Sequence, residues 1–321
     1  MIVCIGIDLG GTKIAAAAVD IAAGTVSGRT VVPTEAHEGP AAVLQRMATI
    51  VDAVIVEAGL ERSQIAGLGI GVPGVIEPDS GTTLLLPNLA TAWRGVPAGA
   101  EMRRLTRLDA WLVNDARAFT LAEATLGAGR GARTVVGVTL GTGIGGGIAI
   151  DGRLQLGIDM TAGEIGHMTI DPHGPPCGCG NRGCLEAFAS GPAIAANGVY
   201  AVMRGYTTLI GELAERDVSR ITPETILKAA EQGDQVAQEI LERCGTHLGV
   251  GLANLVTVLS PERIVVGGGA AQLGDWLLGP TRREIQRRCF VTPLDRVAVV
   301  PAVLADAGIV GAAVWASQRS A

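Results

Sequence analysis

The feature that most constrains the fold is a strand, glycine turn and strand that occurs twice, at residues 2–20 and 135–151. The first copy reads IVCIGIDLGGTKIAAAAVD and the second VVGVTLGTGIGGGIAID. Apolar runs of strand length on either side of glycines predict a β-hairpin in each case. A gapless superposition matches several residues of the two copies, namely Gly6 with Gly137, Leu9 with Leu140, Gly10 with Gly141 and Asp20 with Asp151. A pattern that recurs at the start of each half predicts an internal duplication and two similar domains.

Helical and strand patterns alternate between and after the hairpins, which predicts an α/β fold. Apolar residues at helical spacing predict helices at 41–59 and 116–126, and buried runs predict strands at 65–72 and 111–113. The last third predicts mostly helix at 223–259, a strand at 263–266 and a closing helix at 306–318.

Composition excludes several classes of protein. Hydrophobic residues make up 48% and charged residues 17% of 321 residues, so the chain is not mainly disordered. No apolar run reaches the roughly 20 residues that span a bilayer, so no membrane association is expected. A net charge of -6 argues against nucleic acid as a partner. Because no basic region precedes the apolar residues after Met1, we expect no signal peptide and a cytoplasmic protein.

The first glycine turn could hold an anion. Asp8 precedes Gly10 and Gly11, and Thr12 and Lys13 follow them. Backbone N–H groups in such a turn suit phosphate, since glycine lets the anion approach the backbone, and Asp8 could hold magnesium or its waters. A plain hairpin turn is the alternative interpretation.

The second turn, LGTGIGGG at residues 140–147, contains the glycine spacing of a dinucleotide-binding loop. A dinucleotide loop must open a helix, whereas residues 148–150 run directly into Asp151 and Gly152 and leave room only for a short strand. A nicotinamide-dependent dehydrogenase is therefore disfavoured. The chain also lacks the GxxxxGK[ST] pattern of the common P-loop.

One histidine and three cysteines have the spacing of a metal site: His167, Cys177, Cys179 and Cys184. Three thiolates and one imidazole complete a tetrahedral zinc shell, so the zinc would be structural. Disulfide pairing is the alternative, and a reducing compartment disfavours it.

Polar residues near this loop could bind a sugar. Glu164 and Glu186 flank the metal ligands, and Asn114 and Asp115 follow a predicted strand. Carboxylates accept hydrogen bonds from the paired hydroxyls of a sugar, which apolar pockets do not. Solvated surface glutamates and a common Asn-Asp turn are the alternatives.

Taken together, these motifs resemble the ROK family, which includes bacterial glucokinases. The resemblance runs from residue 5 to about 311 and is carried by DLGGTK at 8–13, Asn114-Asp115, LGTGIGGG at 140–147, GEIGH at 163–167, CGCGNRGCLE at 177–186 and GGG at 267–269. It implies an actin-like, hexokinase-type fold of two ribonuclease-H-like domains with a cleft between them. We expect a small domain at 1–116, completed by the closing helix at 306–321, and a larger domain at 117–305 that holds the zinc loop 163–186.

The resemblance also implies roles for individual residues in ATP-dependent phosphorylation of D-glucose at its C6 hydroxyl, a reaction of glycolysis. Asp115 would be the catalytic base. The sugar would be bound by Asn88, Asn114, Asp115, Glu164, His167 and Glu186. The nucleotide and Mg²⁺ would be bound by Asp8, Gly10, Gly11, Thr12, Lys13, Gly141, Thr142, Gly143, Gly267, Gly268 and Gly269. Zn²⁺ would be bound by His167 and the three cysteines.

Alternatives within the resemblance stay open. The substrate could be fructose, mannose, allose or N-acetylmannosamine, and polyphosphate could replace ATP. Repressors of the family carry an added N-terminal DNA-binding domain, for which the hairpin that begins at residue 5 leaves no room. A sugar-binding regulator without catalysis would be expected to lack Asp115, which is present. Relatives of this kind are commonly homodimers or homotetramers, and we expect the same here.

Overall fold

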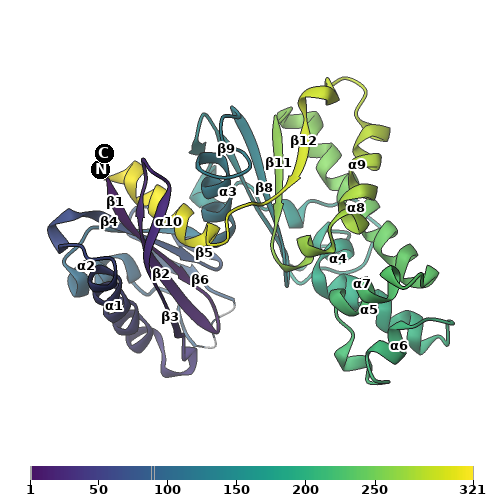
Figure 1. Ribbon diagram of the computed structural model, residues 1–321, viewed down its shortest axis with the longest axis horizontal. Helices are drawn as coiled ribbons and strands as arrows, with labels where there is room; N and C mark the ends of the chain where they lie inside the picture. The colour runs from purple at the N-terminus through teal and green to yellow at the C-terminus, as the bar shows by residue number, and fades with distance from the viewer. Residues whose placement is uncertain (1, 88, 90, 321) are drawn as a thin grey trace. The chain divides into compact units, whose positions relative to one another are not determined.

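The computed structural model describes residues 2–87, 89 and 91–320, in which helices and strands alternate (Figure 1). Contacts between Cα atoms divide the chain into two compact units. Unit 1 comprises Met1–Gly131, Gly147–Gly163 and Val303–Ala321, and unit 2 comprises Ala132–Gly146 and Glu164–Ala302. The chain therefore crosses from one unit to the other at four places, after residues 131, 146, 163 and 302.

Unit 1 is built on a sheet with the strand order β3-β2-β1-β4-β7. The strands of this sheet are β1 (Val3–Leu9), β2 (Lys13–Asp20), β3 (Thr25–Pro33), β4 (Ile65–Val72) and β7 (Ala110–Asn114). A separate hairpin pairs β5 (Val75–Glu77) with β6 (Thr82–Leu85). The helices of the unit are α1 (Pro40–Glu57), α2 (Ala98–Thr106), α3 (Asp115–Thr125) and α10 (Ala307–Arg319).

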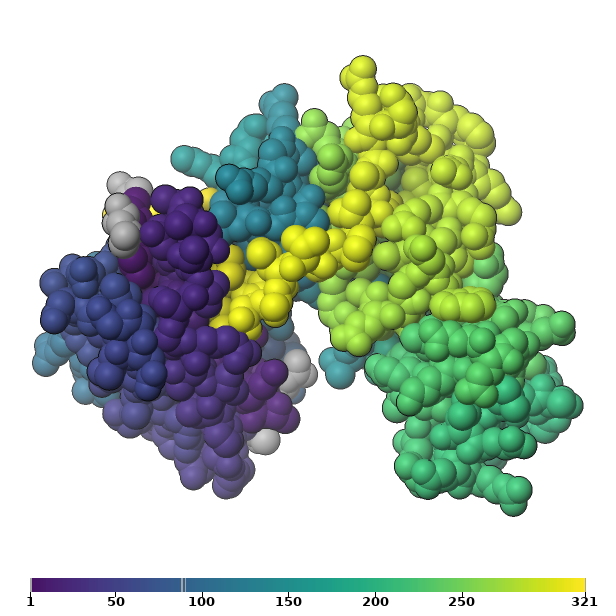
Figure 2. Space-filling view, in the orientation of Figure 1, coloured from purple at the N-terminus to yellow at the C-terminus, as the bar shows by residue number. Residues whose placement is uncertain are grey.

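The closing helix α10 packs against β1, β4 and α3. Glycines in the sheet make this close approach possible. A Cβ atom at Gly6 would lie 1.9 Å from the carbonyl oxygen of Ile309, and one at Gly69 would lie 1.6 Å from that of Ala312. The C-terminal segment, yellow in the space-filling view, lies against the purple N-terminal strands (Figure 2).

The second sheet has the strand order β10-β9-β8-β11-β12. Its strands are β8 (Thr134–Leu140), β9 (Ile144–Ile150), β10 (Arg153–Leu154), β11 (Arg263–Gly267) and β12 (Ala298–Pro301). The helices of unit 2 are α4 (Glu186–Ala189), α5 (Gly191–Met203), α6 (Ile210–Leu213), α7 (Pro223–Glu231), α8 (Gln235–Leu259) and α9 (Asp275–Arg288).

The two sheets share one topology, which supports the predicted internal duplication. In the first, β2 pairs antiparallel with β3, and β4 pairs parallel with both β1 and β7. In the second, β9 pairs antiparallel with β10, and β11 pairs parallel with both β8 and β12. The two predicted hairpins thus occupy the same positions in the two strand orders.

The predicted helices and strands are confirmed, with one difference. The helical pattern at 223–259 forms two helices, because Gly233 adopts a left-handed conformation (φ +86°) and Asp234 caps the start of α8. Helix α3 lies wholly in unit 1, where it packs against α10. The domain bounds expected from the resemblance stay a prediction. No helix in the described part of the chain is long and apolar enough to cross a membrane.

Candidate active site

The glycine turn of unit 1 is held by a buried threonine. The N–H group of Gly10 donates to the carbonyl oxygen of Lys13 at 2.9 Å. Thr34, which follows β3, donates from Oγ1 to the carbonyl oxygen of Gly10 at 2.7 Å and from its backbone N–H to that of Thr12 at 2.9 Å. Its side chain is fully buried. These bonds fix the shape of the turn independently of any ligand.

Asp8 stands at the end of β1, directly before this turn. Burial raises the pKa of its carboxyl group, while Lys13 lowers it and the nearby carboxylate of Asp306 raises it further. The carboxyl group lies against the first turn of α10, since a Cβ atom at Gly308 would lie 2.9 Å from Oδ2 of Asp8. The positive end of a helix dipole favours an anion at this place.

Asn114 and Asp115 join β7 to α3. Oδ1 of Asn114 caps the helix by accepting from the N–H groups of Ala116 and Arg117 at 3.1 and 3.2 Å. Its Nδ2 donates to the carbonyl oxygen of Gly74 at 3.1 Å, so both ends of the amide are engaged within unit 1. Asp115 is the first residue of α3, and its Oδ1 accepts from the N–H group of Ala116 at 2.8 Å.

The surroundings of Asp115 raise the pKa of its carboxyl group to about 6. Burial is the main cause, and the negative charge of Asp8 adds to it. The hydrogen bond from Ala116 and the positive charge of Arg117 act in the opposite direction. A carboxylate with a pKa near neutrality can accept a proton from a substrate hydroxyl and release it afterwards.

The two predicted nucleotide segments of unit 2 are neighbours. Parallel pairing places Gly267 opposite Thr139 at the ends of β11 and β8. Gly268 has a φ of +88°, and a Cβ atom there would lie 2.3 Å from the carbonyl oxygen of Leu140. By contrast, a Cβ atom at Gly141 or Gly269 would meet nothing within 4 Å. Both glycines therefore border open space at the same sheet edge, which suits phosphates and a nucleoside.

The four predicted zinc ligands come together in unit 2. Their ligand atoms all lie within 4.8 Å of one another. The Sγ atom of Cys177 is 3.8 Å from Nδ1 of His167, and the Sγ atoms of Cys179 and Cys184 are 3.8 Å apart. A tetrahedral zinc ion with Zn–S distances of about 2.3 Å requires ligand separations of about 3.8 Å. The cluster fits a structural zinc ion.

Glu186 connects the cysteine loop to the second glycine turn. Its Oε2 accepts from the N–H group of Ile144 at 2.9 Å, and the Sγ atom of Cys177 is 3.7 Å from its Oε1. A Cβ atom at Gly143 would lie 2.3 Å from Oε2, so this contact requires glycine. Glu164 directly precedes the short helix Ile165–His167, which ends at the predicted metal ligand His167.

The predicted site residues fall into two groups. Unit 1 holds Asp8, Gly10, Gly11, Thr12, Lys13, Asn114 and Asp115. Unit 2 holds Gly141, Thr142, Gly143, Glu164, His167, Cys177, Cys179, Cys184, Glu186, Gly267, Gly268 and Gly269. Asn88 lies outside the described residues.

Sequence reasoning missed two residues that support the site. Thr34 holds the first glycine turn, and no motif distinguishes it from other threonines at the ends of strands. Arg117 is almost fully buried and lowers the pKa of Asp115, and its Nε donates to the carbonyl oxygen of Ala162 at 3.0 Å. Arg117 lies two residues after the candidate base in a helix of small apolar residues, and this unusual position could have indicated that it supports the site.

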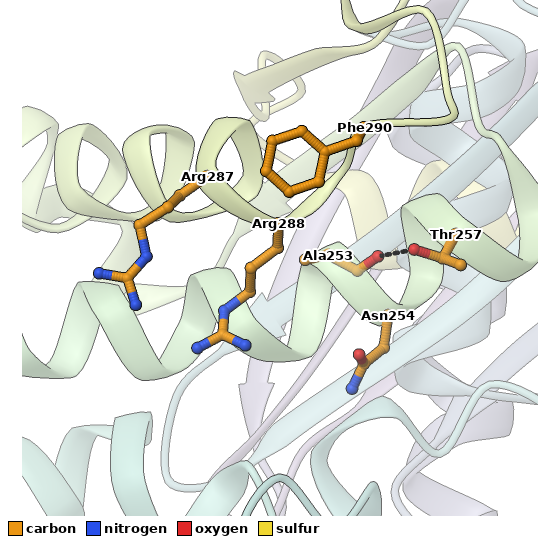
Figure 3. A pocket seen from close by; sticks show the side chains of 6 residues that line it. All are labelled: Ala253, Asn254, Thr257, Arg287, Arg288 and Phe290. Carbon is orange, nitrogen blue, oxygen red and sulfur yellow. Dashed lines mark hydrogen bonds between the residues drawn. The ribbon is translucent and has the colours of Figure 1, made fainter.

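A separate cavity of about 430 Å³ lies in unit 2 and is lined by residues of α8 and α9 (Figure 3). Its lining residues are Ala253, Asn254, Thr257, Arg287, Arg288 and Phe290, and none of them is a predicted site residue. Arg287 and Arg288 both pair with the carboxylate of Glu284, at 3.5 and 2.5 Å. The phenyl ring of Phe290 is exposed.

Comparison with known proteins supports one family. The chain matches the ROK family over residues 4–319. It belongs to the ROK family. Among curated relatives, the glucokinase of Thermotoga maritima is 36% identical, with 98% of this chain and 97% of the relative covered. The xylose repressor of Caldicellulosiruptor bescii is 34% identical, with 77% of this chain and 61% of the repressor covered.

A solved ROK structure extends the likeness to the fold. The ROK glucokinase of Streptomyces griseus, in complex with glucose and AMPPNP, superposes with a TM-score of 0.80. It is 33% identical, with 98% of this chain and 99% of that chain covered. The actin-like, hexokinase-type fold expected from the resemblance is confirmed.

Proposed function

We propose that this ROK protein is a hexokinase-type sugar kinase that transfers the γ-phosphoryl group of ATP to the C6 hydroxyl of D-glucose. The observation that carries the proposal is the position of Asp115 as the first residue of α3, where its Oδ1 accepts from the N–H group of Ala116 and its carboxyl group interacts with Asp8 and Arg117. Relatives named glucokinase and a relative bound to glucose and AMPPNP support the choice of sugar and nucleotide.

In the proposed reaction, Asp115 accepts the proton of the C6 hydroxyl as that oxygen attacks the γ-phosphorus. The bond from the γ-phosphorus to the bridging oxygen breaks, and ADP leaves with the electron pair. Phosphoryl transfer depends mainly on positioning and charge neutralisation. Backbone N–H groups of the two glycine turns and Lys13 would hold the phosphates, and Asp8 would hold Mg²⁺ or its waters. Magnesium would neutralise charge on the phosphates.

The sugar contacts are proposed for Asn88, Asn114, Glu164, His167 and Glu186. Because Nδ1 of His167 faces Cys177, its Nε2 would be the atom that contacts a sugar hydroxyl. Glu186 has one oxygen on the N–H group of Ile144, and a carboxylate can accept further bonds. Zinc would therefore orient a sugar ligand and take no part in phosphoryl transfer.

The test is sugar-dependent ADP release by the purified, zinc-replete protein with ATP and Mg²⁺, measured against glucose, fructose, mannose, allose and N-acetylmannosamine, with a no-sugar control. We expect the highest kcat/KM with glucose. ADP release with another hexose alone would show that glucose is not the substrate but that the protein is a sugar kinase. Sugar binding by calorimetry without ADP release would instead support a regulator, as the likeness to a repressor allows. A parallel assay with polyphosphate tests the donor.

Three further properties complete the proposal: a cytoplasmic location, a role in glycolysis and assembly into a homodimer or homotetramer. Relatives of the same family and length named glucokinase support the metabolic role. Light scattering of the purified protein at several concentrations tests the assembly, and a monomer at micromolar concentration would contradict it.

A further inference from the structure

Glu123, on α3, is a completely buried acidic residue that the proposed reaction does not use. Its Oε2 accepts from the N–H group of Ala128 at 2.8 Å. Its Oε1 accepts from the N–H groups of Val303 and Leu304 at 3.1 and 2.9 Å. The side chain thus receives three backbone hydrogen bonds from two segments that are far apart in the sequence.

These two segments are where the chain leaves and re-enters unit 1. The first leads to the crossing after Gly131, and the second begins at Val303, directly after the last crossing. The backbone carbonyl oxygen of Glu123 also accepts from the N–H groups of Gly127 and Gly129, at 3.2 and 2.9 Å. The first segment therefore wraps tightly around Glu123.

Energetics favour a positional role for this carboxylate. A buried charge is costly unless hydrogen bonds compensate it, and apolar residues often stabilise a core as well or better. The three N–H donors provide that compensation, since bonds to a charged acceptor are stronger than neutral ones. An apolar side chain accepts no hydrogen bonds, so it could not hold two chain segments in place at once.

Glu123 shares a helix with the proposed base. Asp115 begins α3, and Glu123 lies eight residues later, which corresponds to about 12 Å along the helix axis. Resting on the proposed function, we infer that Glu123 is a positioning residue. Glu123 holds the chain next to the crossings after residues 131 and 302 against α3, the helix that carries Asp115. These two chain segments would therefore keep their position relative to Asp115 if unit 2 moves during turnover.

The test replaces Glu123 by glutamine, which keeps the shape of the side chain but turns one acceptor into a donor. For Glu123→Gln we expect a fall in kcat of about tenfold or more, within the range for misplacing reacting groups. The KM for ATP should stay within twofold, because the side chain of Glu123 makes its hydrogen bonds to Ala128, Val303 and Leu304 and none of these is a proposed nucleotide-binding residue. The acid limb of the pH profile should stay near pH 6, because the surroundings of Asp115 are unchanged. Glu57→Gln, at the exposed end of α1, is the control.

A merely structural role predicts a different result, namely a lower melting temperature with unchanged kcat, and that outcome would overturn the inference. Should Glu123→Gln fail to fold, Glu123→Asp keeps the charge, shortens the side chain and carries the same test. Amide hydrogen exchange separates the inference from the proposed function. In the Glu123→Gln variant, amide exchange should quicken at least tenfold on the side that faces the new NH₂ group, which is either Ala128 or the pair Val303 and Leu304. Unchanged amide exchange in the variant would refute the role of Glu123 as an anchor, even if the enzyme is active. A wild-type protein without kinase activity would refute only the proposed function.

Discussion

Asp115 shows how burial can raise the pKa of an ordinary carboxylic acid toward neutrality. Its position at the start of α3 follows from the sequence, but its proton affinity depends on Asp8 and Arg117 and on burial by the surrounding chain. A lone Asn-Asp pair in a turn would keep the ordinary pKa of an aspartate.

Replacement of Asp115 by Asn should lower kcat by about 100-fold or more, the usual range for loss of a general base. The same variant should melt at a higher temperature at pH 7.5. The pKa of the Asp115 carboxyl group is about 6 in the folded protein and 3.8 in the unfolded chain, so the ionised carboxylate destabilises the folded state above pH 6. This destabilisation disappears as the pH falls from 6 to 3.8, because the carboxyl group becomes protonated. Calorimetry at pH 7.5 and pH 4 checks the sign. Asp109→Asn, at an exposed position, is the control. Near-normal turnover of Asp115→Asn would show that Asp115 is not the general base.

The activity of the wild-type protein should depend on pH through the same carboxyl group. Below about pH 6 Asp115 becomes protonated and cannot accept the hydroxyl proton, so kcat/KM for glucose should fall about tenfold for each further pH unit. Initial rates from pH 4.5 to 8 at constant ionic strength measure this limb. A flat profile down to pH 5 would show that the base titrates elsewhere.

At the scale of elements, the glycine turns can be tested without disturbing the fold. Gly141 borders open space, so Gly141→Ala should melt within about 1 °C of the wild type. If a phosphate occupies that space, the added methyl group should raise the KM for ATP about tenfold or more. Gly279→Ala in α9 adds a methyl group that makes only an ordinary contact and is the control. An unchanged KM in Gly141→Ala would place the phosphates elsewhere.

The cysteine loop is the second element whose role can be isolated. Cys184→Ser should lose the bound zinc, lower the melting temperature by several degrees and abolish most sugar binding, because the loop carries His167 and leads into Glu186. Elemental analysis should find one zinc ion per wild-type chain. Cys289→Ser, a buried thiol outside the cluster, should keep it. A zinc-free wild-type protein with full activity would contradict this role.

At the scale of the whole molecule, the proposed chemistry requires groups from both units to reach the same pair of substrates. Unit 1 holds Asp8 and Asp115, and unit 2 holds the two glutamates proposed to bind sugar and the segment at Gly267–269. The mechanism therefore predicts that sugar binding brings the units closer and excludes water from the γ-phosphate.

Small-angle X-ray scattering with and without saturating glucose measures this closure. We expect a smaller radius of gyration with glucose and no change with a sugar that is not phosphorylated. Identical profiles in a protein that phosphorylates glucose would mean that catalysis needs no large movement.

The sequence alone determined the α/β class, the duplicated hairpin and the cluster of one histidine and three cysteines. These features are local, or repeat at a fixed spacing, so neighbouring residues carry enough information to predict them. The same holds for the glycine turns and the start of α3 after Asn114.

Only the tertiary structure decided which distant groups act on these motifs. The bond from Thr34 to Gly10 and the contact of Asp8 with α10 each join segments without a shared pattern. Glu123 is the clearest case, because its partners at Val303 and Leu304 lie about 180 residues away. Burial and hydrogen-bond partners of this kind depend on how the chain packs, and they set the pKa of Asp115 and the anchoring of the crossings, which motif spacing alone does not specify.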